Sequence, residues 1–235
     1  KANGTGVSNT AGTITSTVSA NTTSGFSIVT YTGTGANATV GHGLGVAPSM
    51  IIVKRRNSTG SWDVYHASVG NTMALFLNQT ASQNTDIGYW NNTSPTSTVF
   101  TVGIGTEVNQ STGTYVAYCF AAISGYSAFG SYTGNGSADG PFVYCGFRPK
   151  YVLIKQSSTS GTDWIVYDST RNPYNLTNLL LSPNSSAAET TSAGSNTLDL
   201  LSNGFKLRSA STGSNGGTMI YAAFAENPLK FSNAR

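Results

Sequence analysis

The feature that most constrains the fold of this chain is an internal repeat. The string "GFSIVTYTGTG" at residues 25–35 returns as "GYSAFGSYTGNG" at residues 125–136. Further along, "GLGVAPSMIIVK" matches "YCGFRPKYVLIK" and "GTYVAYCFAA" matches "GTMIYAAFAE", in the same order and at similar spacing. The offset between matching residues drifts only from 100 to 105 over the two halves. A repeat this regular predicts two tandem copies of one domain of about 100 residues.

Each copy reads as a set of short strands separated by Gly-rich turns. Residues 50–53 and 151–154 are continuous apolar runs, which are typical of a central strand covered on both faces. In the last strand of the first copy, alternation places Val116 and Phe120 on one face and small alanines on the other. We expect Val116 and Phe120 to face the core. We therefore predict an all-β fold of two tandem homologous β-sandwich domains with a jelly-roll-like form.

The repeat also sets the expected domain boundaries. Residues 25–124 form the first β-sandwich repeat and residues 125–231 form the second. Residues 1–24 hold few apolar anchors, so we expect a linker or an extended N-terminal arm that pairs with a neighbour. Residues 232–235 remain as a tail. Because the first copy is preceded by this arm and the chain begins without a methionine, we expect a piece of a longer protein.

The composition implies a neutral surface that is rich in hydrogen-bonding groups. Only 9% of the residues are charged, against roughly 25% in ordinary soluble domains. The net charge is +3, and the single tight basic run at residues 54–56 is too narrow for a nucleic-acid-binding face. No apolar run is long enough to span a bilayer. We expect no nucleic-acid partner and no membrane insertion.

The residues that could carry catalysis form no recurring pattern. None of the nine acidic residues recurs as a pair in both copies, although hydrolysis of a polysaccharide needs two facing carboxylates. A single-copy site around Asp163 and Asp168 stays open as an alternative. The two histidines have no partner at metal-binding spacing, and the two cysteines form no metal pattern. We expect a protein that is not an enzyme and that holds no cofactor and no metal.

Recognition is expected where the two copies differ. Asp86, Tyr89 and Trp90 lie in the polar stretch "DIGYWNN", whose aromatic pair has no clear match in the second half. Loops on a rigid scaffold commonly carry binding residues. These three residues are therefore the predicted ligand-binding set, with simple packing of the two rings as the alternative.

Four strings resemble repeats in long virion proteins of marine bacteriophages, which are described as tail-fibre-like or appendage-like. The strings are "STVSANTTSGFSIVTYTGTGANATVGHGLGVAPSMIIVK", "FGSYTGNGSADGPFVYCGFRPKYVLIK", "LSNGFKLR" and "YAAFAENPLKF". The resemblance covers residues 9–231. It implies a place on the virus particle as an extracellular appendage, contacts with other virion proteins and assembly as a homotrimer. It identifies neither catalytic residues nor a receptor.

The resemblance and the composition together lead to a bacteriophage virion fibre segment that is not an enzyme. Its expected role is adhesion to the host surface, through a glycan or a protein, because a neutral hydroxyl-rich surface can bind sugars without attracting charged molecules at random. The first alternative is a purely structural spacer or a capsid-decorating fibre module. The second alternative is a virion-associated polysaccharide depolymerase.

Overall fold

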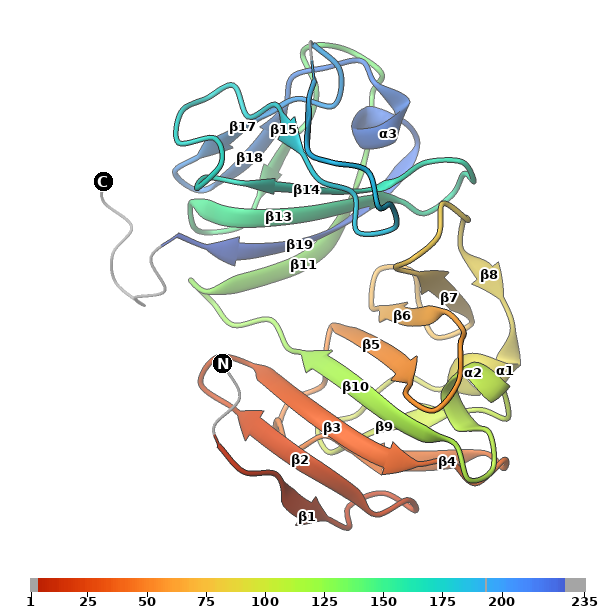
Figure 1. Ribbon diagram of the computed structural model, residues 1–235. Helices are drawn as coiled ribbons and strands as arrows, with labels where there is room; N and C mark the ends of the chain where they lie inside the picture. Colours follow the sequence, from red (N-terminus) through yellow and green to blue (C-terminus); the bar gives the residue numbers. More distant parts are fainter. Residues whose placement is uncertain (1–3, 193, 227–235) are drawn as a thin grey trace. The chain divides into compact units, whose positions relative to one another are not determined.

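The computed structural model describes residues 4–192 and 194–226, which are almost entirely strands and turns, so the predicted all-β fold is confirmed. The chain divides into two compact units (Figure 1), each with its own hydrophobic core. Unit 1 comprises residues 1–77 and 83–122, and unit 2 comprises residues 78–82 and 123–235. The predicted tail at residues 232–235 lies outside the described residues.

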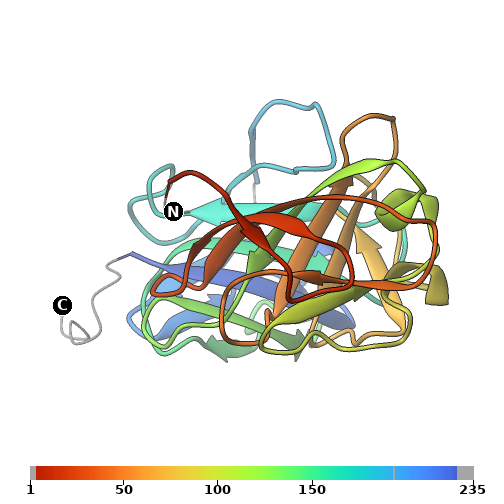
Figure 2. The ribbon, with the colours of Figure 1, turned by 90° about the horizontal axis from the view of Figure 1, so that it is seen from below.

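Unit 1 is built on one large antiparallel sheet. Its strands lie in the order β1 (Val7–Asn9), β2 (Ser16–Asn21), β3 (Phe26–Thr32), β10 (Thr114–Phe120), β5 (Met50–Arg55), β6 (Trp62–His66), β7 (Met73–Phe76) and β8 (Asn84–Thr85). A second layer (Figure 2) is formed by β4 (Ala38–Gly41) and β9 (Val99–Val102). Two short helices, α1 (Ile87–Trp90) and α2 (Thr106–Asn109), lie in the connections. The segment predicted to be a linker or arm thus forms β1 and β2, and β2 pairs with β3.

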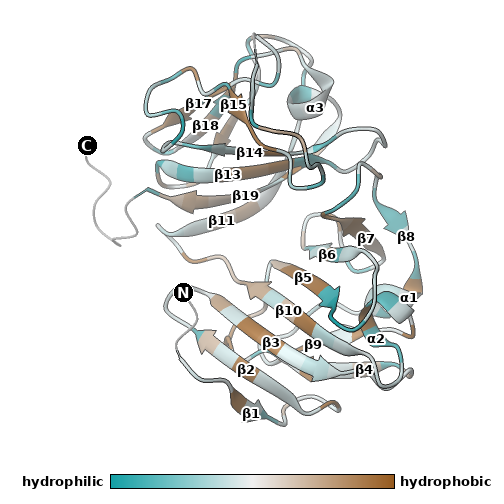
Figure 3. Cartoon of the chain, viewed as in Figure 1, coloured by the Kyte–Doolittle hydropathy of each residue, from teal (hydrophilic) through white to brown (hydrophobic). Residues whose placement is uncertain are grey.

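The core of unit 1 lies between the two layers. Strand alternation turns Val29 and Tyr31 of β3 inward, where they meet Val40 of β4 and Phe100 of β9. Figure 3 shows the apolar stretches of β3, β5 and β10 as brown segments at the middle of the sheet. This arrangement is a β-sandwich, because two sheet faces bury one apolar layer.

The last strand of unit 1 corrects one expectation about its faces. Tyr115, Ala117 and Cys119 are fully buried and belong to the core cluster. Val116 and Phe120 lie on the other face of β10 and are half-buried, so the expectation that they face the core was wrong.

Unit 2 also has a main antiparallel sheet and a second sheet, with four strands in the main sheet where unit 1 has eight. Its main sheet runs in the order β11 (Ser127–Thr133), β19 (Thr218–Ala225), β13 (Pro149–Gln156) and β14 (Trp164–Asp168). Further strands form a sheet in the order β12 (Phe142–Tyr144), β18 (Gly204–Leu207) and β17 (Leu198–Leu201), and a ribbon of β15 (Leu179–Leu180) and β16 (Thr190–Thr191). One helical turn, α3 (Thr212–Asn215), precedes β19.

The strand pairing agrees with the sequence repeat. The order β3-β10-β5-β6 in unit 1 corresponds to β11-β19-β13-β14 in unit 2. Tyr31 faces Tyr115 across β3 and β10, and Tyr132 faces Met219 at the corresponding place of β11 and β19. A shared origin of the two halves stays a prediction, which this agreement supports.

The repeated Tyr-Thr-Gly of unit 1 ends β3 in a clamp of hydrogen bonds. The Tyr31 hydroxyl donates to the Val108 carbonyl of α2 at 2.7 Å, and burial raises the pKa of this phenol well above its ordinary value. Asn109, which is fully buried, accepts from the Thr34 N–H at 2.8 Å. Its amide nitrogen donates to the carbonyls of Ala36 at 2.6 Å and Gly103 at 2.8 Å. The amide therefore pairs with backbone groups of the turn, and its bond to the Gly103 carbonyl is buried.

Unit 2 forms the same clamp with its own residues. The Tyr132 hydroxyl donates to the Ser214 carbonyl of α3 at 2.6 Å. The buried Asn215 accepts from the Asn135 N–H at 3.0 Å and donates to the carbonyls of Ser137 and Ser209 at 2.7 and 2.8 Å. We call these two arrangements the Tyr-Asn clamps of unit 1 and unit 2.

We predict that Asn109→Ala destabilises the chain strongly. The substitution leaves the Thr34 N–H and the buried Gly103 carbonyl without this partner, while the Ala36 carbonyl still accepts from the Thr34 hydroxyl at 3.1 Å. A buried unpaired polar group costs about 1–3 kcal/mol. The expected loss in the free energy of unfolding is about 2–4 kcal/mol, measured by urea denaturation followed by circular dichroism. Asn37→Ala, at an exposed asparagine in the same turn, serves as the control. Equal stability of the two variants would contradict the role given to the clamp.

Candidate functional site

The three predicted ligand residues lie together on α1 of unit 1. The Asp86 carboxylate caps this helix by accepting from the Gly88 N–H at 2.7 Å. Trp90 is only 2% exposed, and its indole N–H donates to the Met73 carbonyl at 3.0 Å. Tyr89 is half-buried with its ring 5.8 Å from that of Phe76, and burial together with the Asp63 and Asp86 carboxylates raises its pKa to about 12. Both rings thus pack against the unit 1 core, and a ligand-binding role for the three residues stays a prediction.

The criterion that selected those residues also selects Tyr174 of unit 2. Tyr174 lies in "DSTRNPYNLTN", a polar stretch whose aromatic residue has no counterpart in the first half. Its side chain is 83% exposed, and the nearby Leu176 is 43% exposed. We call residues 169–178, between β14 and β15, the Tyr174 loop. Tyr174 is the most exposed of the large apolar and aromatic side chains in the described residues, ahead of Tyr144 on strand β12 at 67%.

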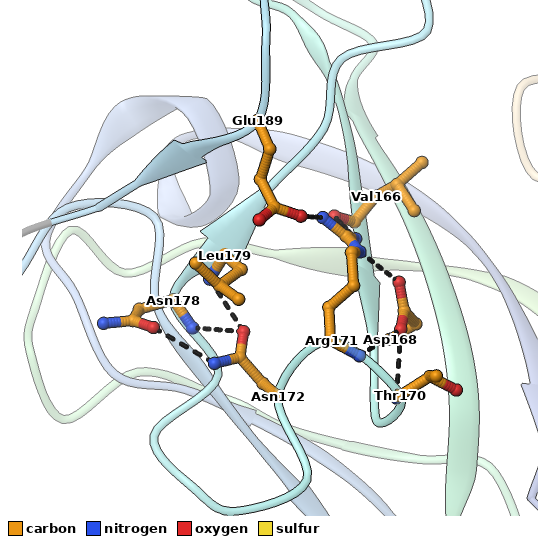
Figure 4. A network of polar contacts seen from close by, with 8 residues as sticks. All are labelled: Val166, Asp168, Thr170, Arg171, Asn172, Asn178, Leu179 and Glu189. Atoms are coloured by element: carbon orange, nitrogen blue, oxygen red, sulfur yellow. Dashed lines mark hydrogen bonds and ion pairs between the residues drawn. The ribbon is translucent and has the colours of Figure 1, made fainter.

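Arg171 holds the beginning of the Tyr174 loop in place (Figure 4). Its guanidinium forms ion pairs with Asp168 at the end of β14 and with Glu189, the latter at 2.9 Å, and donates to the Val166 carbonyl at 3.0 Å. Partial burial raises the pKa of Asp168, but hydrogen bonds from the Arg171 backbone and side chain outweigh this effect, so the pKa lies below its ordinary value. The carboxylate is therefore ionised at neutral pH.

Three asparagines hold the rest of the loop. The Asn172 side chain accepts from the Asn178 N–H at 3.2 Å and from the Leu179 N–H at 2.7 Å, which closes the loop at its ends (Figure 4). Asn175 pairs with Leu200 in both directions, donating to its carbonyl at 3.2 Å and accepting from its N–H at 2.9 Å. Because both ends and the middle are bonded, the loop presents Tyr174 in an ordered position.

A second candidate region is an open depression on the outer face of the unit 1 sheet, with a volume of about 200 Å³. Its lining combines the exposed guanidinium of Arg56 with five threonines, and Tyr31 and Tyr115 complete it. The threonine side chains are not hydrogen-bonded within the described part of the chain, and neither is the Arg56 guanidinium. The threonines are Thr15, Thr17, Thr30, Thr32 and Thr114. Such a surface offers hydroxyl groups and one cation to a polar ligand.

The carboxylates that could have supported hydrolysis are engaged or buried. Asp168 is bound by Arg171, and Asp163 accepts from the Asn184 amide at 2.7 Å. Asp63 is fully buried, and neither of its oxygens has a hydrogen-bond partner within the described residues. Burial, reinforced by Glu107 and weakened by Lys54, raises the pKa of Asp63 to about 7. In unit 2 the position that corresponds to Asp63 is occupied by Ile165 of β14.

Metal binding and membrane crossing are two further properties on which the described residues give information. In residues 4–192 and 194–226, no three His, Cys, Asp or Glu side chains gather where they could hold a metal ion. Within those same ranges, no helix is both long and apolar enough to cross a membrane.

Comparison with known proteins places the chain in one family. Residues 1–228 match the model of the domain of unknown function DUF7483, and the chain belongs to this family. No curated protein and no solved structure matches it significantly.

We predict that Asp63 makes the chain less stable as the pH rises from about 4 to about 7. Its pKa is raised in the folded state from 3.8 to about 7, so the folded protein holds a proton that the unfolded chain releases in this window. The difference in unfolding free energy between the wild type and Asp63→Asn should be small at pH 4. At pH 8 it should favour the variant by on the order of 4 kcal/mol.

Urea denaturation of both proteins between pH 4 and pH 8 measures this effect. Subtracting the two profiles removes the contributions of groups that titrate in both proteins, such as Asp168. A constant difference across the range would show that Asp63 is ionised or solvated in the folded state.

Proposed function

We propose that this member of the DUF7483 family is a segment of a bacteriophage virion fibre that adheres to host-surface glycan and is not an enzyme. The observation that carries the proposal is the Tyr174 loop, where hydrogen bonds and ion pairs order the backbone and leave an aromatic ring 83% exposed. The place on the virion, the contacts with other virion proteins and the homotrimeric assembly come from the resemblance of the repeats to phage appendage proteins.

An exposed tyrosine on an ordered loop suits the recognition of sugars. Its ring offers an apolar face, and its hydroxyl can donate and accept hydrogen bonds. A loop that is already ordered loses little conformational entropy on binding, so more of the contact energy appears as affinity. The Arg171 network supplies this order, because it joins the loop to β14 and to Glu189.

The unit 1 depression supports the same proposal. Sugars are bound largely through hydroxyl groups, which the five threonines can pair, and the Arg56 guanidinium adds a site for a carboxylate or sulfate group. The low charge of the whole chain, 9% of residues, limits non-specific attraction to other charged surfaces.

Experiments can distinguish adhesion from two other functions, those of a structural spacer and of a depolymerase. A spacer or capsid-decorating module would have the same stable sandwiches and would bind no glycan. A depolymerase would need a carboxylate pair, and Asp163 and Asp168, the pair that the sequence left open, are bound to Asn184 and Arg171.

We predict that Tyr174→Ala weakens binding to host cells or host glycans by about tenfold or more, because it removes a central aromatic contact worth at least about 1.4 kcal/mol. Adsorption of the labelled 235-residue chain to host cells, with a glycan array in parallel, measures the effect. Tyr144→Ala is the matched control, since Tyr144 is also exposed, at 67%, but lies on strand β12. Its binding should stay within about twofold of the wild type.

The other outcomes favour another function or another site. A wild-type chain that binds neither cells nor any glycan would favour the spacer. Release of reducing sugar from host polysaccharide would favour the depolymerase. Unchanged adsorption of Tyr174→Ala together with lost adsorption of Tyr89→Ala would move the site to α1.

We predict that Arg56→Gln weakens binding to acidic glycans and leaves binding to neutral glycans unchanged. The guanidinium is the cation of the depression, so its loss removes an attraction that neutral sugars do not use. Binding to uronate-containing and neutral oligosaccharides, compared at low and physiological salt, checks this expectation. An equal change for both classes would contradict a charge-specific role for Arg56.

A further inference from the structure

The two units differ at one edge of their main sheets. In unit 1 the outer side of β3 is covered by β2, with Thr17 facing Thr30 and Val18 facing Val29. In unit 2 the corresponding strand, β11, pairs with β19, and the described part of the chain supplies no strand on its other side. The strand that is interior in unit 1 is therefore an edge strand in unit 2.

Chain connectivity explains the difference. β2 reaches β3 through the short turn at residues 22–25, so the first unit receives a covering strand from the segment before it. The strand that precedes β11 is β10, which lies in the middle of the unit 1 sheet and is paired there on both sides. Among the described residues, no strand adjacent in sequence is left to cover β11.

The hydrogen bonds between β11 and β19 show which N–H groups of β11 point to the open side. The Gly134 N–H donates to the Gly217 carbonyl at 2.8 Å and so points toward the β19 side. Because successive N–H groups of a strand point to opposite sides, those of Ser131 and Thr133 point away from β19. Both residues are exposed, and their backbone N–H groups have no partner within the described residues.

β11 lacks the features that normally prevent edge strands from pairing. Its seven residues, Ser-Ala-Phe-Gly-Ser-Tyr-Thr, include no charge and no proline. Its register with β19 is continuous from Ser127 to Thr133, so no bulge twists the edge away. Protected edges are usually short, charged, bulged or covered. Ile123 already pairs with Ser127 on the outer side, with the Ser127 N–H donating to the Ile123 carbonyl at 2.9 Å. The edge around Ser131 and Thr133 is neutral and regular, which is the form of a strand that accepts a partner.

We propose that two copies of this chain associate by antiparallel pairing of their β11 strands, which joins their unit 2 sheets into one. A second copy of the chain is the favoured partner, because its own β11 has the same open side. Its β2 is not available, because it already pairs with β3 in unit 1. A twofold pairing satisfies both edges at once and brings no like charges together. The interface goes beyond the adhesive function and does not depend on it.

The test is the mass of the full chain measured by light scattering over a range of concentrations. The wild type should form a dimer, in place of the trimer that the resemblance implies. Ser131→Pro should weaken dimerisation at least tenfold, because proline removes an outward N–H without removing a β19 bond. Ser131→Val keeps the N–H and should dimerise like the wild type. Unfolding curves of the two variants should coincide, which shows that the proline is tolerated.

A second variant covers the case in which Ser131→Pro does not fold. Ser131→Lys keeps the backbone N–H and places a cation at the edge, so its dimerisation should be weakened at low salt and partly restored at high salt. A wild type that stays monomeric at all concentrations would overturn the proposal. So would a dimer or trimer that neither Ser131→Pro nor Ser131→Lys affects, because the contact would then lie elsewhere.

Discussion

The Tyr-Asn clamp is the interaction on which the rest of each unit depends. The phenol of Tyr31 or Tyr132 reaches from the main sheet to a carbonyl of the helical turn before the last strand. The buried amide of Asn109 or Asn215 then binds the turn that follows the tyrosine strand. One clamp therefore fixes two chain segments more than seventy residues apart, and it sets where β10 or β19 enters the sheet. A displaced clamp would leave buried polar groups unpaired, which costs more than the bonds themselves contribute.

The sequence predicted this scaffold well because the clamp restricts the residue types that can occupy it. Gly33 and Gly134 follow the tyrosines where a β-carbon would collide with the backbone of residues 110 and 215. Such positions accept one residue type, so they are the places where the two halves still read alike. The strands were also predictable, because the alternation of apolar and polar residues can be read from neighbouring positions in the sequence. The alternation could not predict which face of β10 is the core, because a two-sided pattern does not say which side the second layer covers.

The candidate site was less predictable because exposure is decided by contacts far away in the sequence. Trp90 and Tyr174 are both unmatched aromatic residues in polar stretches. Trp90 is buried because its ring packs into the unit 1 core and Met73 of β7 accepts its N–H. Tyr174 is exposed because Arg171 and Asn172 hold the loop through bonds to Glu189 and Leu179. Neither set of partners is visible in the local sequence, so the criterion that recognition lies where the copies differ could not separate a buried ring from an exposed one.

The corresponding positions of Asp63 and Ile165 show what the shared scaffold permits. Both side chains point into a sandwich core from the strand next to the central apolar one, yet one can ionise and the other cannot. A buried carboxylate without hydrogen bonds lowers stability whenever it is charged, so unit 1 tolerates a cost that unit 2 avoids. That tolerance implies that the clamp and the sheet packing leave a margin of stability in unit 1. With such a margin the same framework can carry changes at a core position, in a loop or at a sheet edge while the strand order stays the same.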